Sequence, residues 1–273
     1  MAYTTETLYF EDPLFPNVPV TYVLTMIGSS RREQYMSQLR LYRPTPKVVI
    51  LHNKGYKHGD KPDWVSWPAA DTWHANTEVF RRESNTPYVL ILEDDFIFTH
   101  HIIKYADSVY SFLERHNDCT YYNLGAVPLW TNPLARMACK HIRVYVSGSC
   151  HACIWTNAGM SAFESFILPD QSLSDYEVSR RSKSYMHRYP LAIQAHEKTA
   201  TFKTWPWIAR AYIYPWMVLT NVERDGRLFY EMHHLFAIMG GIAPTMALCI
   251  IAIIHNVRKK SHQRLSYEPA PKL

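Results

Sequence analysis

YVLILEDDFIF, residues 88–98, joins two apolar runs through three consecutive acids. The first run is rich in branched and aromatic residues and follows Pro87, so it predicts a strand that is covered on both faces. Glu93, Asp94 and Asp95 then stand at the carboxyl end of this strand. In open α/β sheets that end is where ligands bind, which makes the three acids candidate binding residues.

The three carboxylates imply a cation. Adjacent carboxylates repel one another, so a fold that holds them at the end of an apolar strand needs a compensating positive charge. Oxygen ligands favour Mg²⁺ or Mn²⁺ over zinc, and such an ion commonly bridges to substrate phosphates, which implies a diphosphate substrate. The alternative is a strand-to-loop junction with solvated acids, which the apolar residues on both sides disfavour.

Strands and helices alternate along the first half of the chain. Apolar runs predict strands at 20–26 and 47–52, and the capping-box spacing of Ser30 and Glu33 predicts a helix at 30–40. Further helices are expected at 71–83, where Asp71 can cap the first turn, and at 102–115. This order predicts βαβ units, and hence an α/β fold with a mostly parallel sheet flanked by helices.

Size and charge limit the possible classes of protein. With 273 residues, of which 47% are hydrophobic, the chain can form one catalytic-size domain plus an attachment. The formal net charge is +5, and residues 255–273 carry five basic residues against one acid, which leaves +1 for the rest. A nucleic-acid partner therefore has no support from charge.

The five cysteines do not predict a disulfide framework, because their number is odd and a chain of this length needs no covalent staples. Cys150 and Cys153 form a C-x-x-C pair, which suggests redox chemistry or half of a zinc site. No second Cys/His pair of suitable spacing accompanies them, so both readings are disfavoured.

The order of the motifs resembles glycosyltransferase family 25, the LPS-type and collagen-type sugar transferases of the GT-A fold, including relatives in large DNA viruses. Leu92-Glu93-Asp94-Asp95 followed by an aromatic residue is similar to the family's metal-binding signature. The segment 144–155 resembles a later strand of the family, and 189–194 its closing Pro-Leu-x-x-Gln strand. The resemblance, over residues 18–200, implies a GT-A-like, Rossmann-type sheet and sugar transfer from a nucleoside-diphosphate donor to a hydroxyl of a glycan or glycoprotein.

The resemblance also implies roles for individual residues. The residues that it implies as ligands of Mn²⁺ or Mg²⁺ are Glu93, Asp95 and His196. The residues that it implies as donor-binding are Arg31, Arg32, Glu93, Asp94, Gly148 and His151. Asp175 is the expected general base for the acceptor, with Asp170 as the other position that fits. Non-catalytic roles remain open: a solvated first turn for the two arginines, a buried structural role for His151, and a helix N-cap for either aspartate.

Residues 235–254 contain no Asp, Glu, Lys, Arg or His, and twenty such residues meet the length of a membrane-spanning helix. Gly240, Gly241 and Pro244 disfavour a helix in water but are tolerated in membrane spans. We therefore expect an N-terminal extension (1–17), a transferase domain (18–230), one transmembrane helix (235–254) and a basic tail (255–273).

Two signals conflict over the topology of this single-pass anchor. The basic tail would stay in the cytosol under the positive-inside rule, which places the catalytic domain in the lumen. The first seventeen residues do not have the features of a signal peptide, and the free cysteines suit a cytosolic domain, so that orientation is preferred.

Two other functions fit part of the pattern. A glycoside hydrolase also needs paired carboxylates, but on both sides of a sugar and without a metal. A catalytically inactive, membrane-anchored binding or assembly protein could keep a GT-A fold, although the intact acidic triplet argues against a decayed site.

Overall fold

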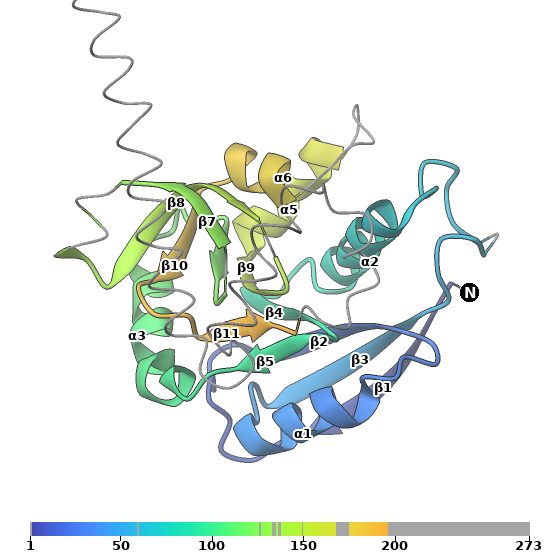
Figure 1. Ribbon diagram of the computed structural model, residues 1–273, viewed down its shortest axis with the longest axis horizontal. Coiled ribbons are helices and arrows are strands. Elements are labelled where there is room, and N and C mark those ends of the chain that lie inside the picture. The colour runs from blue at the N-terminus through green and yellow to red at the C-terminus, as the bar shows by residue number, and fades with distance from the viewer. Residues whose placement is uncertain are drawn as a thin grey trace, which may run out of the picture.

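The computed structural model describes residues 2–58, 60–125, 127–132, 135, 138–148, 150–167 and 175–195. Within these residues the chain forms a mixed α/β fold, in which a large central sheet lies between helices (Figure 1). In the described part of the chain no helix is both long enough and apolar enough to cross a membrane. The predicted transmembrane helix and basic tail lie outside the described residues.

The strands of the described chain are β1 (Tyr3–Tyr9), β2 (Val20–Met26), β3 (Lys47–Asn53), β4 (Tyr88–Glu93), β5 (Phe96–Phe98), β6 (Tyr121–Asn123), β7 (Val127–Thr131), β8 (His141–Gly148), β9 (Ala152–Thr156), β10 (Ser184–His187) and β11 (Ala192–Gln194). The helices are α1 (Arg32–Tyr42), α2 (Pro68–Arg82), α3 (His101–Arg115), α5 (Asn157–Ile167) and α6 (Asp175–Arg181).

The main sheet is mixed rather than mostly parallel. Its order is β1-β3-β2-β4-β9-β6-β10-β8-β7. β3, β2 and β4 run parallel, as do β6 and β10, while the remaining neighbours pair antiparallel. The prediction of a mostly parallel sheet is therefore wrong for the half beyond β4. An apolar strand that is buried on both faces has the same residue pattern in either direction, so the sequence pattern did not reveal that β9 runs against β4.

Two apolar layers, one on each face of the sheet, form the core. On β4, Leu90 and Leu92 pack with residues of α1 and α3, whereas Val89 and Ile91 pack with residues of α2 and α5. These two pairs of helices lie on opposite sides of the sheet in Figure 1. Alternate residues of one strand serve both layers, which explains why the run 88–92 is apolar without interruption.

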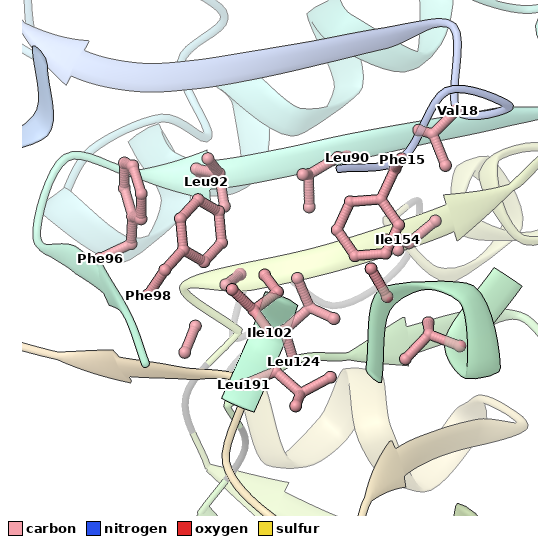
Figure 2. Close-up of a cluster of buried hydrophobic side chains, with 14 of the residues drawn as sticks. Phe15, Val18, Leu90, Leu92, Phe96, Phe98, Ile102, Leu124, Ile154 and Leu191 are labelled. Atoms are coloured by element: carbon pink, nitrogen blue, oxygen red, sulfur yellow. The ribbon is translucent and has the colours of Figure 1, made fainter. Parts of the chain in front are cut away.

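The end of the described chain returns to the acidic turn. β11 pairs antiparallel with β5 in a separate two-stranded sheet, with Gln194 opposite Phe96. Phe96 and Phe98 are buried in the same layer as Leu92, as Figure 2 shows. β4, the acidic turn and β5 are thus held on both sides by core packing.

Three local expectations change in the structure. Residues Tyr3–Tyr9, within the segment predicted as an N-terminal extension, form an edge strand that pairs with β3. The cap of α1 is Arg31, without a side-chain hydrogen bond, so the capping box at Ser30 is not formed. α2 was expected to begin at Asp71 but begins at Pro68, whose fixed φ angle suits a first helical turn. Asp71 is therefore not the cap of this helix, and its carboxylate forms an ion pair with Lys61.

Candidate active site

The acidic turn joins β4 to β5, and backbone hydrogen bonds fix it on both sides. The N–H of Glu93 donates to the carbonyl oxygen of His151 over 2.8 Å, and the N–H of Ala195 donates to that of Asp95 over 2.8 Å. Because β2 runs parallel to β4 with Leu24 opposite Glu93, the turn lies beside the carboxyl end of β2. The acids therefore occupy the predicted ligand-binding edge of the parallel strands.

Asp94 accepts three hydrogen bonds from the end of β2 and the segment that follows it. Its Oδ2 accepts from the hydroxyls of Thr25, over 2.8 Å, and Ser29, over 2.7 Å. Its Oδ1 accepts from the Arg31 guanidinium over 2.7 Å. Both oxygens of this carboxylate are thus occupied by the protein itself.

Asp95 is more deeply buried and less completely bonded. Only 3% of its surface is exposed, and its Oδ2 accepts a hydrogen bond of 3.0 Å from Nε2 of Gln194. Its Oδ1 is buried and has no hydrogen-bond partner among the described residues. Burial raises the pKa of Asp95 from 3.8 to about 6, although the Gln194 hydrogen bond and the Arg31 charge oppose the increase.

The pKa of Glu93 is raised by burial and by the other acids of the site. Burial raises its pKa well above the ordinary value, and the charges of Asp95, Asp175 and Asp94 raise it further, whereas Arg31 acts in the opposite direction. Asp175 is the first residue of α6. The structure therefore brings Asp175, the predicted general base, close enough to Glu93 to interact with it electrostatically.

His151 immediately precedes β9, and Gly148 ends β8. His151 is 1% exposed, and its carbonyl oxygen holds Glu93. A Cβ atom at Gly125 would lie 2.7 Å from its Nε2 and 2.1 Å from the carbonyl oxygen of Ala192, so only glycine fits there. Gly148 is the last residue of β8 and pairs with Val127.

The C-x-x-C pair lies beside the same acids. Cys150 and Cys153 are free thiols. A hydrogen bond with Cys153, burial and the Asp175 charge raise the pKa of the Cys150 thiol well above its ordinary value. Because the thiolate is the reactive and metal-binding form, this environment disfavours both chemistries.

Not every predicted residue joins the group. The Arg32 guanidinium bonds with the Glu6 carboxylate and the Tyr35 hydroxyl, on the side of α1 that faces β1. Asp170 and His196 lie outside the described residues. Three residues that sequence reasoning had not selected, Thr25, Ser29 and Gln194, contact the acids directly. Of these, only Gln194 belonged to a recognised motif, and its strand position could have suggested a site role.

The part of the chain that the structure describes contains no group of three or more His, Cys, Asp or Glu residues arranged to hold a metal ion. Two of the three predicted ligands, Glu93 and Asp95, belong to that part, and the third, His196, does not. The buried Oδ1 of Asp95, without a hydrogen-bond donor in the described residues, is an acceptor that a hard cation fits. The donor set present is therefore compatible with Mn²⁺ or Mg²⁺.

No family model matches this sequence, and no curated protein matches it. Among solved structures, the chain is similar to A197 from STIV, with 11% identity and a TM-score of 0.39, over 62% of this chain and 81% of that one. It is also similar to a glycosyltransferase involved in the glycosylation of the major capsid of PBCV-1, with 12% identity and a TM-score of 0.35, over 66% of this chain and 95% of that one. Similarity at this level supports no conclusion about activity.

Proposed function

We propose that this protein is a metal-dependent glycosyltransferase, which moves a sugar from a nucleoside-diphosphate donor to a hydroxyl of a glycan or glycoprotein. The observation that carries the proposal is the buried carboxylate of Asp95, whose Oδ1 has no hydrogen-bond partner in the described chain and which lies beside the acid Glu93. The sequence motifs that resemble glycosyltransferase family 25 support the same activity.

The charge balance of the site favours a bound cation. The charges of Asp95, Asp175 and Asp94 all act on Glu93, and Arg31 is the cation among the described groups that opposes them there. Burying several carboxylates against one guanidinium is unfavourable unless they are protonated or bind a further positive charge. Mn²⁺ or Mg²⁺ held by Glu93 and Asp95, with His196 as a further ligand, would stabilise the negative charge that develops on the departing diphosphate.

The protein's own groups would complete the site. Asp175 would accept the proton of the acceptor hydroxyl, for which a carboxylate within hydrogen-bonding reach of the acceptor suffices. Arg31 would offer its charge to the donor diphosphate, and the segment from Gly148 to His151 would contact the sugar. The carbonyl oxygen of His151 accepts a hydrogen bond from the backbone N–H of Glu93, which ties His151 to the acidic turn.

The activity can be tested with the full chain in detergent. UDP- and GDP-sugars would be screened for nucleotide release with Mn²⁺ and then with EDTA. We expect one donor to release nucleotide with Mn²⁺ and none to do so with EDTA. Asp95→Asn should abolish release, while Asp118→Asn, which changes an exposed acid paired with Lys183, should leave it unchanged.

The same assay separates the alternatives. No release together with no Mn²⁺-dependent nucleotide binding would overturn the proposal and favour a binding or assembly protein. Hydrolysis of glycosides that continues in EDTA would favour a glycoside hydrolase, which uses two carboxyl groups and no metal.

A further inference from the structure

The three acids of the turn differ in what surrounds them, and Asp94 is the one whose partners all come from a single neighbouring segment. Thr25, Ser29 and Arg31, which donate to it, lie within seven consecutive residues that run from the end of β2 to the residue before α1. We propose that Asp94 is a positioning residue, which holds Arg31 beside Asp95, and that it is not a ligand of the metal or the donor. The donor-binding part of this proposal rests on the proposed function, whereas the link between Asp94 and Arg31 does not.

The contacts of Asp94 leave little capacity for an external ligand. A carboxylate offers about four lone-pair sites, and three of those on Asp94 are already used. The bond of 2.7 Å from Arg31 has the length of a charge-assisted hydrogen bond, and the two hydroxyl bonds of 2.8 and 2.7 Å have ordinary O–H···O lengths. A metal ion or a sugar hydroxyl would have to displace one of these donors, whereas Oδ1 of Asp95 has none to displace among the described residues.

The segment that donates to Asp94 has a defined shape of its own. The N–H of Ser29 donates to the carbonyl oxygen of Met26 over 3.0 Å, and Gly28 has a φ angle of 77°. A four-residue turn with a positive φ at its third residue requires glycine or a similarly permissive residue there. The turn directs the Ser29 hydroxyl to Asp94, so the turn and the acid fix each other.

Arg31 lies between two acids of the site. Its Nη1 is 2.7 Å from Oδ1 of Asp94 and 3.7 Å from Oδ2 of Asp95, and its side chain is 12% exposed. The closer contact is with Asp94. If Asp94 lost its charge, Asp95 would be the nearest of the described acids, and the guanidinium would move onto the carboxylate that the proposed metal needs. Asp94 therefore keeps Arg31 near Asp95 but prevents the guanidinium from bonding directly with the Asp95 carboxylate.

Metal affinity provides a test through rescue. Mn²⁺ binding to the full chain would be measured by electron paramagnetic resonance for wild type, Asp94→Asn, Arg31→Gln and the double variant. Asp94→Asn should weaken binding by about tenfold, in the range found when a residue that orients a metal ligand is lost. The double variant, which has the same site charge as wild type, should recover most of this loss. A double variant as weak as Asp94→Asn, or an Asp94→Asn variant with unchanged affinity, would overturn the proposal.

Donor binding gives a second readout with UDP and GDP as probes in Mn²⁺. Asp94→Asn should weaken nucleotide binding. The double variant should bind nucleotide no more weakly than the single variant Arg31→Gln. Additive losses would mean that Asp94 contacts the nucleotide independently, against the proposal. Asp118→Asn and its double variant with Lys183→Gln serve as the matched control, because they remove an exposed ion pair.

Thermal unfolding in EDTA keeps the two proposals separate. Asp94→Asn should lower the melting temperature by about 5 °C or more, because it leaves Arg31 without its closest counter-charge. The double variant should not lower it by the sum of the two single changes. If wild type binds no Mn²⁺, the proposed function fails, but this cycle still decides whether Asp94 and Arg31 act as one unit.

Discussion

Gln194 donates a hydrogen bond from its Nε2 to Oδ2 of Asp95 over 3.0 Å, across a sequence separation of 99 residues. The bond lowers the pKa of Asp95, whereas burial raises it. The amide therefore helps to keep this carboxylate ionised near neutral pH, and it occupies one oxygen while Oδ1 faces no donor in the described chain.

Removing the Gln194 amide should weaken Mn²⁺ binding most at low pH. In Gln194→Ala the pKa of Asp95 rises further, so protons compete with the metal more strongly. We expect the dissociation constant to increase about tenfold at pH 6 and by less at pH 8, measured by electron paramagnetic resonance. Gln38→Ala is the control, because Gln38 accepts a hydrogen bond from Phe98 and is not bonded to Asp95. Equal effects of the two changes would contradict the prediction.

The raised pKa of Asp95 should make the metal-free protein less stable as the pH increases. Between pH 3.8 and 6 the folded state holds a proton on Asp95 that the unfolded state has lost, so the free energy of unfolding decreases across this window. Asp95→Asn removes the effect and should be more stable than wild type at pH 8 by up to roughly 3 kcal/mol. Urea denaturation in EDTA at pH 4 and pH 8 measures this difference. A variant that is less stable than wild type at pH 8 would contradict the prediction.

Buried His187 should have the opposite pH dependence. Burial lowers its pKa from 6.5 to about 4, so between these values the unfolded state binds a proton that the folded state does not. The free energy of unfolding therefore falls as the pH decreases from 6.5 to 4, by up to roughly 3 kcal/mol for this group. His187→Gln should lose less stability than wild type over this range in urea denaturation. The exposed His58→Gln variant controls for the loss of a histidine.

The buried ion pair of Lys61 and Asp71 should be costly to break from one side. Their side chains are 1% and 5% exposed, and Asn53 bonds with both. Lys61→Met leaves a buried carboxylate without its cation and should reduce the free energy of unfolding by about 3–5 kcal/mol. Lys61→Met combined with Asp71→Leu should recover part of the loss. Lys183→Met, at an exposed pair, should cost less than about 1 kcal/mol.

Substitution by alanine should reduce stability for different reasons at Gly125 and at Gly28. At Gly125 a Cβ atom would lie 2.1 Å from a backbone oxygen of Ala192, so Gly125→Ala must displace β11 and should weaken Mn²⁺ binding as well as stability. At Gly28 nothing lies within 4 Å and only the positive φ angle is strained, which costs about 1–2 kcal/mol. Chemical denaturation and Mn²⁺ titration of both alanine variants would test this contrast.

The sequence pattern predicted the strands whose residues form a continuous buried apolar run. β2 was expected at 20–26 and occurs there, because its residues are almost all buried between the two apolar layers. The acidic turn was expected at the carboxyl end of a strand and occurs at the end of β4. The sequence pattern did not predict β1, because most residues of this edge strand are exposed or half-buried and form no clear apolar run. Its pairing with β3 is therefore visible only in the structure.

The partners of the acids could not be read from local patterns. Thr25 and Ser29 meet Asp94 across separations of 69 and 65 residues, and their side chains carry no spacing signal that points to an aspartate. Their contact follows from the parallel pairing of β2 with β4, which fixes the register of Leu24 and Glu93. Side-chain roles within the triplet therefore depend on the sheet, whereas the presence of a charged turn depends only on the local sequence.

The return of β11 to β5 has a consequence for synthesis on the ribosome. The acids at 93–95 leave the ribosomal exit tunnel long before Gln194 and Ala195, which hold Asp95 in the finished structure. Domains generally fold as units, so these two hydrogen bonds to Asp95 form only after the last described strand has left the tunnel. Premature termination before residue 192 would thus yield a chain that has its three acids but lacks the two residues that bond with Asp95.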